Sequence, residues 1–380
     1  MTNTLSDLRF DVLQLSANEK LVLDHIWRYG PISRKALADL TGLTGASTSR
    51  LTRHALSIGL IEESVAYSGS VGSPSRPLQR TSDGAYSVGV SFAKNLIECA
   101  VSDLSGNLGE VHQREVENVT IDDIAGLVLD TVSTDPQTKD NALIVLGVGL
   151  AVPGYRSTHD GEWAAHWDFP DLLGVDLATE VAKKTNLPVF AERDSIACLW
   201  SEHLNGAFRT VSNLCLLYLA QGVGGAVMSD GQLVLGQNGN AGGLGALFPY
   251  GERRPSAADL SEFLKLDADQ FFSTTAILSA PADKIDRWVE LVQPSLRYAL
   301  TVIARLYDPA TVVMSGSLPT TVLRQLIDSV SDLDLPEQYT AALPTPELAV
   351  TQSPDTGRLL SAAATLPFAS IVSRPRVAVP

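Results

Sequence analysis

The segment GPISRKALADLTGLTGASTSR, residues 30–50, constrains the fold of this chain more than any other part of it. Ser33 can cap one short helix, and Thr44 can cap another over residues 45–57, because both hydroxyls can accept from free N–H groups at a helix start. Thr41-Gly42 supplies the tight turn between these helices. The segment therefore predicts a helix-turn-helix whose second helix is rich in hydroxyls and ends in cations, as a helix in a DNA major groove requires.

Flanking residues extend this prediction to a winged helix-turn-helix. Ser16 and Glu19 have the spacing of a capping box for an earlier helix that ends at Gly30. Residues 60–65 and 78–81 have the character of two paired strands, joined by a loop of small residues. A helical module for protein interaction is the alternative interpretation, and winged helices also serve in that way.

The predicted DNA face consists of the side chains that remain after the leucines are assigned to the core. Hydroxyls and cations are the groups that contact phosphates and base edges. We expect double-stranded DNA to contact Ser33, Arg34, Thr44, Ser47, Thr48, Ser49, Arg50 and Arg53, together with Ser73 and Arg76 of the wing.

Charge is divided along the chain in a way that fits a DNA-binding N-terminus. Residues 1–80 hold 9 Lys and Arg against 7 Asp and Glu, a net charge of +2, whereas the remainder carries −17. An acidic surface repels phosphates, so contact with nucleic acid must be confined to the N-terminal part. Acidity also favours solubility, which explains the −17 without any function.

Length and cysteine content limit the class of protein. A chain of 380 residues predicts more than one domain, and we place a boundary between residues 1–82 and 83–380. Three cysteines without CxxC spacing argue against a disulfide scaffold and a cysteine-rich zinc site. No signal segment and no membrane-spanning apolar run is evident, so we expect a cytoplasmic protein without membrane contact.

From Ala85 onward, apolar strand patterns alternate with helical ones, which is typical of an α/β domain. Ligands of such domains bind beyond the ends of the strands. The expected strands span residues 86–91, 96–102, 142–150, 187–191, 214–220, 224–228 and 310–316, and the expected helices span 121–132, 177–185 and 291–306.

The order of these motifs resembles the ROK family of repressors and sugar kinases. The N-terminal match lies in residues 30–63 and in the Arg-Pro pair at 76–77. The resemblance covers nearly the whole chain. It implies an actin-like, hexokinase-like ATPase fold in two lobes after the winged helix-turn-helix, and a protein that works as a homodimer or homotetramer.

The phosphate-binding loops of family kinases are altered here. The first loop, an Asp-x-Gly-x-Thr type, is replaced by Ser91-Phe92-Ala93-Lys94-Asn95, which lacks both the acidic residue and the glycines. A backbone phosphate cradle needs glycine so that N–H groups can approach an anion. The second loop, residues 219–225, keeps most of its glycines but is also typical of a hairpin turn. We therefore expect no nucleotide cofactor and no catalytic residues.

This sequence also differs from the family at the positions that bind sugar and zinc. Its Asn-Asp pair appears as Arg193-Asp194, so Asp194 stands at the catalytic-base position, although it can equally cap a helix that starts at Ser195. The family's Glu and His become Gly243 and Ala246, and its cysteine cluster is replaced by residues 250–256, so no zinc site is expected.

The scaffold turns of the family are retained. If an effector exists, the resemblance places it against Pro153, Gly154, Arg193, Asp194, Gly242 and Gly243. Arg193 favours an anionic sugar derivative, unless it pairs with Glu192 or Asp194 and closes the site. The sequence thus predicts a DNA-binding transcriptional regulator that acts as a repressor. The alternatives are a sugar kinase and a regulator whose large domain is only a dimerisation scaffold.

Overall fold

The computed structural model describes residues 14–64, 76–140, 145–157, 161–249, 251–267, 273–331 and 344–373. The chain divides into two compact units, Met1–Asn205 with Leu359–Pro380 and Gly206–Arg358, which we call the first and the second unit. The second unit is thus inserted into the first, and the chain passes between them after Asn205 and after Arg358.

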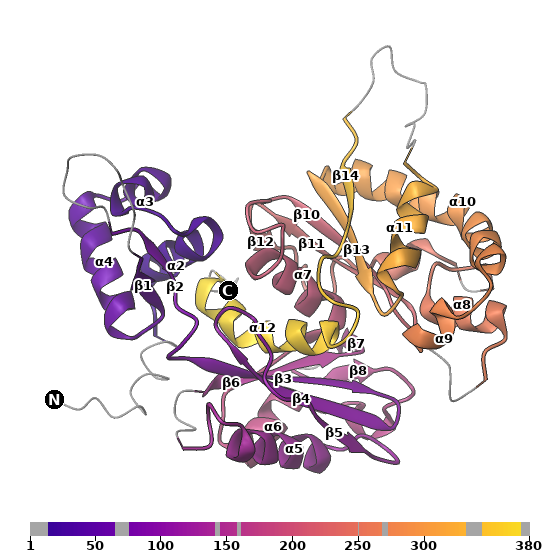
Figure 1. Cartoon of the computed structure of the whole chain (residues 1–380), viewed down its shortest axis with the longest axis horizontal. Coiled ribbons are helices and arrows are strands. Elements are labelled where there is room, and N and C mark those ends of the chain that lie inside the picture. The colour runs from indigo at the N-terminus through magenta and orange to yellow at the C-terminus, as the bar shows by residue number, and fades with distance from the viewer. Residues whose placement is uncertain are drawn as a thin grey trace. The chain divides into compact units, whose positions relative to one another are not determined.

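The described residues 14–64 and 76–80 of the first unit form three helices and a two-stranded hairpin, here called the N-terminal module (indigo in Figure 1). Its helices enclose an apolar core, and an antiparallel bridge joins Ile32 to Leu78 of the hairpin. The elements are those that the sequence predicts: α2 (Ala17–Tyr29), α3 (Arg34–Thr41), α4 (Gly45–Ser57), β1 (Ile61–Glu63) and β2 (Leu78–Arg80).

A five-stranded sheet of order β5-β4-β3-β6-β9 forms the centre of the first unit. The three strands β5, β4 and β3 are antiparallel, whereas β6 and β9 continue the sheet in parallel. The central strands are almost wholly buried because helices cover both faces. The strands are β3 (Tyr86–Ala93), β4 (Leu96–Asp103), β5 (His112–Glu115), β6 (Val145–Val152) and β9 (Val189–Arg193).

Helices α5 (Ile121–Thr134) and α6 (Leu177–Thr185) lie on one face of this sheet, and α7 (Asp194–Leu204) and α12 (Arg358–Val372) lie on the other (Figure 1). Two glycines allow α12 to rest directly on the sheet. A Cβ atom at Gly89 would lie 2.4 Å from the Leu360 carbonyl oxygen, and one at Gly149 would lie 1.9 Å from that of Ala363. A side chain at either position would displace α12.

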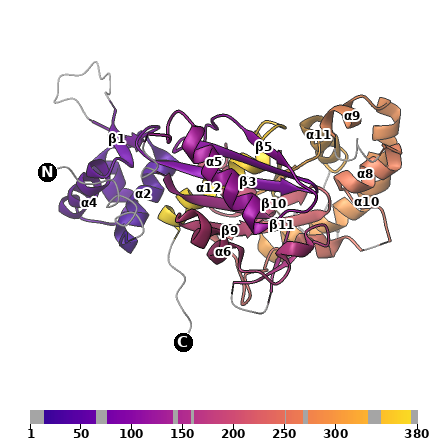
Figure 2. The same ribbon diagram turned by 90° about the horizontal axis from the view of Figure 1, so that it is seen from below.

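A small hairpin extends from the end of β6. Strands β7 (Gly154–Arg156) and β8 (Trp163–Ala165) pair antiparallel, and the short 3₁₀ helix η2 (Pro170–Leu172) follows them. Figure 2 shows the first unit from below, with β3, β9 and the covering α5 and α6 in view. The hairpin brings Pro153 and its neighbours to the edge of the sheet where β6 and β9 end.

The second unit repeats the topology of the first. Its sheet has the order β12-β11-β10-β13-β14, again with three antiparallel strands followed by two parallel ones. This duplication is the two-lobed, actin-like architecture that the sequence predicts. The strands are β10 (Leu214–Leu219), β11 (Val223–Ser229), β12 (Gln232–Leu233), β13 (Thr311–Gly316) and β14 (Glu347–Val350).

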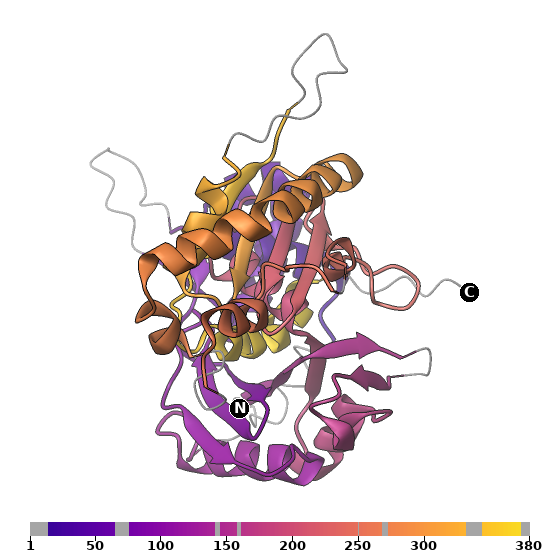
Figure 3. The ribbon, with the colours of Figure 1, turned by 90° about the vertical axis from the view of Figure 1, so that its right-hand side faces the viewer.

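Helices of the second unit bury an apolar core against this sheet, and the long α10 runs across it in Figure 3. The helices are η3 (Leu244–Leu247), α8 (Ala257–Leu264), α9 (Thr274–Leu278), α10 (Ala282–Tyr307) and α11 (Thr320–Asp328). α10 begins nine residues before its predicted start and accommodates Pro294 in its interior. Among the helices that the structure describes, none is long and apolar enough to cross a membrane.

Candidate functional site

Side-chain caps fix the ends of the helix-turn-helix. The Ser33 hydroxyl accepts from the backbone N–H of Ala36 (3.2 Å), and the Thr44 hydroxyl accepts from that of Ser47 (3.2 Å). Gly42 adopts φ +69°, a left-handed conformation that allows the turn between α3 and α4 to be tight. The capping box at Ser16 forms as predicted, so local chemistry determines where these helices begin.

The inner face of α4 packs on the other helices of the module. Leu51, Thr52 and Ala55 are buried there, and Thr48 is fully buried as well. The expectation that Thr48 faces outward is therefore wrong. Its hydroxyl donates to the Thr44 carbonyl (3.1 Å), and its position three residues before Leu51 places it on the apolar stripe of the helix.

The outer face of α4 carries two exposed cations, Arg50 and Arg53, with Ser47 and Ser49 half-buried beside them. Within the described part of the chain, neither guanidinium has a hydrogen bond or an ion pair. Arg50 and Arg53 lie one turn apart, so both project from the same side of α4. An unpaired cation on this face is available to a phosphate or to a guanine edge without breaking an existing contact.

The other two predicted arginines hold the wing together. Arg34 binds Glu63 of β1 (Nη2–Oε1 2.7 Å), and Arg76 binds the second oxygen of the same carboxylate (3.3 Å). Hydrogen bonds from Arg34 and Arg76 keep the pKa of Glu63 below its usual range. Arg34 also donates to Thr52 of α4 (3.4 Å), so it positions the wing against α4. Arg76 is 73% exposed and remains accessible.

Ser73, predicted on the wing, lies outside the described residues, so its contact with DNA stays a prediction. Lys35, which the predicted face does not include, is exposed in the first turn of α3. Glu63 could not be recognised from the sequence, because its bonds to Arg34 and Arg76 depend on the pairing of β1 and β2.

The predicted effector residues of the first unit lie where β6 and β9 end. Arg193 is in register with Val152, the residue before Pro153, and the His166 backbone N–H donates to the Pro153 carbonyl (3.0 Å). The Arg193 guanidinium is almost fully buried and lies 5.6 Å from the centre of the Tyr155 ring. Burial lowers the pKa of Arg193 from its usual value.

Two carboxylates, Glu192 and Asp194, flank Arg193 in the sequence and contribute to its electrostatic environment. Glu192 forms its ion pair with Arg156 (2.9 Å). Asp194 is the first residue of α7 rather than its cap, and its Oδ1 accepts from the Ser195 backbone N–H (2.6 Å). Burial raises the pKa of Asp194 to about 6. Asp194 is half-buried. Its carboxyl group is mostly ionised at neutral pH, so it can accept hydrogen bonds from hydroxyl groups at the end of the strand.

Gly242 and Gly243 belong to the second unit, in a turn that leads into η3. Gly242 has φ +76°, and a Cβ atom at Gly245 would lie 2.0 Å from the Val223 carbonyl oxygen. Gly242 and Gly245 therefore allow the turn to lie directly on β11. Close packing accounts for glycine at these two positions, whether or not a ligand binds.

A family model described as the ROK family matches residues 87–252, from β3 to the turn after η3. This segment, less than half of the chain, is similar to the ROK family. The protein y4fQ of Sinorhizobium fredii is 28% identical over 89% of this chain and 88% of its own length. The xylose repressor of Bacillus subtilis is 25% identical, over 60% of this chain and 59% of its own length, so the alignment spans less than two thirds of that repressor.

Solved ROK structures share the fold. A ROK transcriptional regulator described as a homologue of the E. coli MLC protein superposes with a TM-score of 0.69 at 22% identity, over 93% of this chain and 96% of that one. The ROK glucokinase of Streptomyces griseus superposes with a TM-score of 0.55 at 18% identity, over 74% and 99%. Regulators and kinases of the ROK family therefore both share this architecture.

Both loops that correspond to ROK phosphate loops are hairpin turns. In the first, Phe92 is buried and meets Phe169 edge to face at 5.3 Å, and Asn95 has φ +67° in the turn to β4. In the second, Ala220 donates to the Gly222 carbonyl (2.9 Å) between β10 and β11. Ser91 stands where the kinase motif has its acidic residue, and Ala93 stands where the motif has a glycine.

A polar network is formed around residues 250–256, the segment that replaces the cysteine cluster of the ROK family. Asp259 accepts from the Trp288 indole N–H (2.7 Å), from the Arg253 guanidinium (3.1 Å) and from the Arg254 backbone N–H (3.3 Å). Arg254 in turn donates to the Gly245 carbonyl (3.1 Å). These hydrogen bonds hold the turn at 241–246 against α8 and α10 through protein groups.

Proposed function

We propose that this chain is a transcriptional regulator of the ROK type that binds double-stranded DNA through α4 and the wing, and that it acts as a repressor. The observation that carries the proposal is the pair of exposed, unpaired cations Arg50 and Arg53 on the outer face of a capped helix in the described module. The similarity to a xylose repressor supports the same class of function.

Selection from a random library of DNA duplexes tests this proposal. The full-length chain should enrich one sequence, and paired half-sites are expected if it binds as a dimer. Arg50→Ala together with Arg53→Ala should weaken binding to the selected duplex by about 100-fold, since each base or phosphate contact contributes about 1–3 kcal/mol. Arg324→Ala, an exposed arginine of the second unit, is the matched control. Absence of any enriched sequence would favour a protein-interaction module.

We further propose that the chain does not transfer phosphate. Phe92 at the first phosphate loop, together with Gly243 and Ala246 at the sugar-binding positions, supports this proposal. An assay of ATP-dependent phosphorylation over a panel of sugars should show no turnover. Turnover that Asp194→Asn abolishes would instead identify a kinase.

The effector that we propose is an anionic sugar derivative bound beside Pro153, Gly154, Arg193 and Asp194. The buried guanidinium supports an anion, and the half-buried carboxylate supports a hydroxyl group. Calorimetry with sugar acids, sugar phosphates and neutral hexoses tests this assignment. Tighter binding of a neutral hexose that Arg193→Ala leaves unchanged would contradict the preference for an anion.

The chain is further proposed to dimerise through α10. Leu291, Tyr298 and Leu306 are 39%, 62% and 68% exposed and follow one stripe of that helix. Tyr298→Glu with Leu306→Glu should convert a dimer into a monomer in analytical ultracentrifugation. Leu129→Glu, at an exposed leucine of α5, is the control that should leave the sedimentation coefficient unchanged.

A further inference from the structure

The N-terminal module docks on the C-terminal end of α12. The Lys20 ammonium donates to the carbonyls of Ser370 (2.8 Å) and Ser373 (3.4 Å). A cation at the C-terminus of a helix is favoured by the helix dipole. Trp27, which is 1% exposed, meets Phe368 of α12 edge to face at 6.4 Å. Figure 1 shows the module beside this end of α12.

A second set of contacts joins the module to the point where the chain leaves the first unit. The Arg80 guanidinium lies 5.7 Å from the centre of the Trp27 ring and donates to the Asn205 side chain (2.8 Å). Asn205, the last residue before the second unit, donates in turn to the Thr365 hydroxyl of α12 (3.0 Å). The wing strand, α7 and α12 therefore meet at Asn205.

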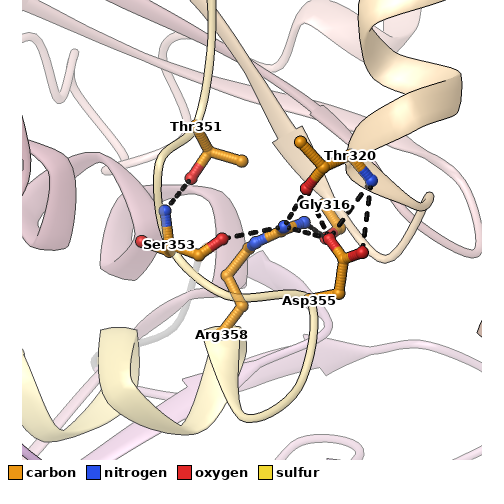
Figure 4. A network of polar contacts seen from close by, with 6 residues as sticks. All are labelled: Gly316, Thr320, Thr351, Ser353, Asp355 and Arg358. Carbon is orange, nitrogen blue, oxygen red and sulfur yellow. Dashed lines mark hydrogen bonds and ion pairs between the residues drawn. The ribbon is translucent and has the colours of Figure 1, made fainter.

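The N-terminal end of α12 is fixed in the second unit. Arg358, whose side chain is 5% exposed, donates to the carbonyls of Gly316 (2.6 Å) and Ser353 (3.0 Å). It also binds the Asp355 carboxylate (2.7 Å) and the Thr320 hydroxyl (3.1 Å), as Figure 4 shows. Buried, charge-assisted hydrogen bonds of this kind are the strong ones.

These contacts give α12 an unusual position in the chain. It is one continuous helix whose first residue belongs to the second unit and whose last turn carries the N-terminal module. The chain passes between the units at two points. At the first, Asn205 is hydrogen-bonded to Thr365 of α12, and at the second, Arg358 is the first residue of α12.

Several of the groups that bind Arg358 line a cavity of about 650 Å³ in the second unit. α11, β14 and the loop after β14 line this cavity, and Thr320, Ser353 and Asp355 are among its lining residues. A molecule that enters it meets three of the groups that bind Arg358.

We propose that α12 transmits the state of the second unit to the N-terminal module, with Arg358 as the positioning residue at one end and Lys20, Trp27 and Arg80 as the contacts at the other. When the groups around Arg358 are displaced, α12 loses its anchor and α2 loses part of its support. This inference goes beyond DNA binding, and its test uses no DNA, so failure of one leaves the other intact.

Hydrogen exchange of the full-length chain tests the transmission. In Asp355→Asn and Arg358→Lys, amides of residues 17–29 should exchange roughly tenfold faster than in the wild type, because a charged hydrogen bond contributes on that order. Arg324→Ala, which lines the same cavity from α11, should leave these amides unchanged. Protection of β10 and β13 shows that the second unit remains folded.

A reciprocal experiment covers the case in which those variants fail to fold. Coupling between two ends of one element must act in both directions. Lys20→Met should therefore accelerate exchange in residues 351–358 of the second unit. The proposal is supported if a substitution at one end of α12 accelerates amide exchange at the other end. It is overturned if, in each of the folded variants, exchange changes only around the substituted residue.

Discussion

Replacement of Asp194 by Asn should stabilise the chain at neutral pH. The pKa of Asp194 is raised from 3.8 to about 6 by burial, a difference of about 2 units. Each pH unit of this difference corresponds to about 1.4 kcal/mol, so ionisation of this half-buried carboxyl costs up to about 3 kcal/mol of unfolding free energy above pH 6. Asparagine keeps an oxygen that can accept from the Ser195 N–H while it removes the charge.

The sign of the pH dependence follows from the raised pKa. The folded chain binds this proton more tightly than the unfolded chain, so the stability that it contributes is complete below about pH 4 and is lost as the pH rises through about 6. Urea-induced unfolding of the wild type and Asp194→Asn should therefore differ at pH 7.5 and coincide at pH 4.

The control for this experiment is Asp171→Asn, since Asp171 is exposed in the same unit. It should leave the unfolding free energy unchanged at both pH values. A destabilised Asp194→Asn at pH 7.5 would show that the carboxylate is held by favourable interactions, and that burial does not dominate its pKa.

Three further substitutions test the structural account. Thr44→Ala should destabilise the N-terminal module by about 1 kcal/mol, measured by hydrogen exchange of α4, because it removes the cap. Thr48→Val should leave DNA affinity unchanged in a gel shift, since Thr48 is buried; a large loss would restore it to the DNA face. Asp259→Ala should cost about 1–3 kcal/mol in thermal unfolding, because the Trp288 indole N–H loses its acceptor. If added zinc restored the thermal stability of this variant, the conclusion that protein groups alone hold the turn at 241–246 would be wrong.

The N-terminal helices were predictable because their ends are encoded locally. Ser16, Ser33 and Thr44 each accept from a backbone N–H within three residues, so sequence spacing alone places the cap. α12 could not be predicted because its segment SAAATLPFAS, residues 361–370, lacks the apolar and polar alternation that marks an exposed helix. Only the sheet and α2, both distant in the sequence, explain why it is buried.

The composition of the candidate DNA face was only partly predictable for the same reason. Arg50 and Arg53 are exposed as their spacing from Leu51 indicates, but Thr48 faces the core because three- and four-residue steps connect it to Leu51 and Thr52. The role of Arg34 depends on Glu63, which is 29 residues away and reaches Arg34 only when the wing strands pair. Residue type therefore identified the cations, whereas tertiary structure decided which of them are unpaired.

The salt dependence of DNA affinity tests the central claim most directly. Each phosphate contact releases counterions, so the slope of log K against log salt concentration counts the contacts at about 0.9 each. We predict a steep slope for the full-length chain on its selected duplex, reduced by about 2 when Arg50 and Arg53 are both replaced by Ala, if both bind phosphates. An identical affinity and slope in the double variant would contradict DNA binding through this face.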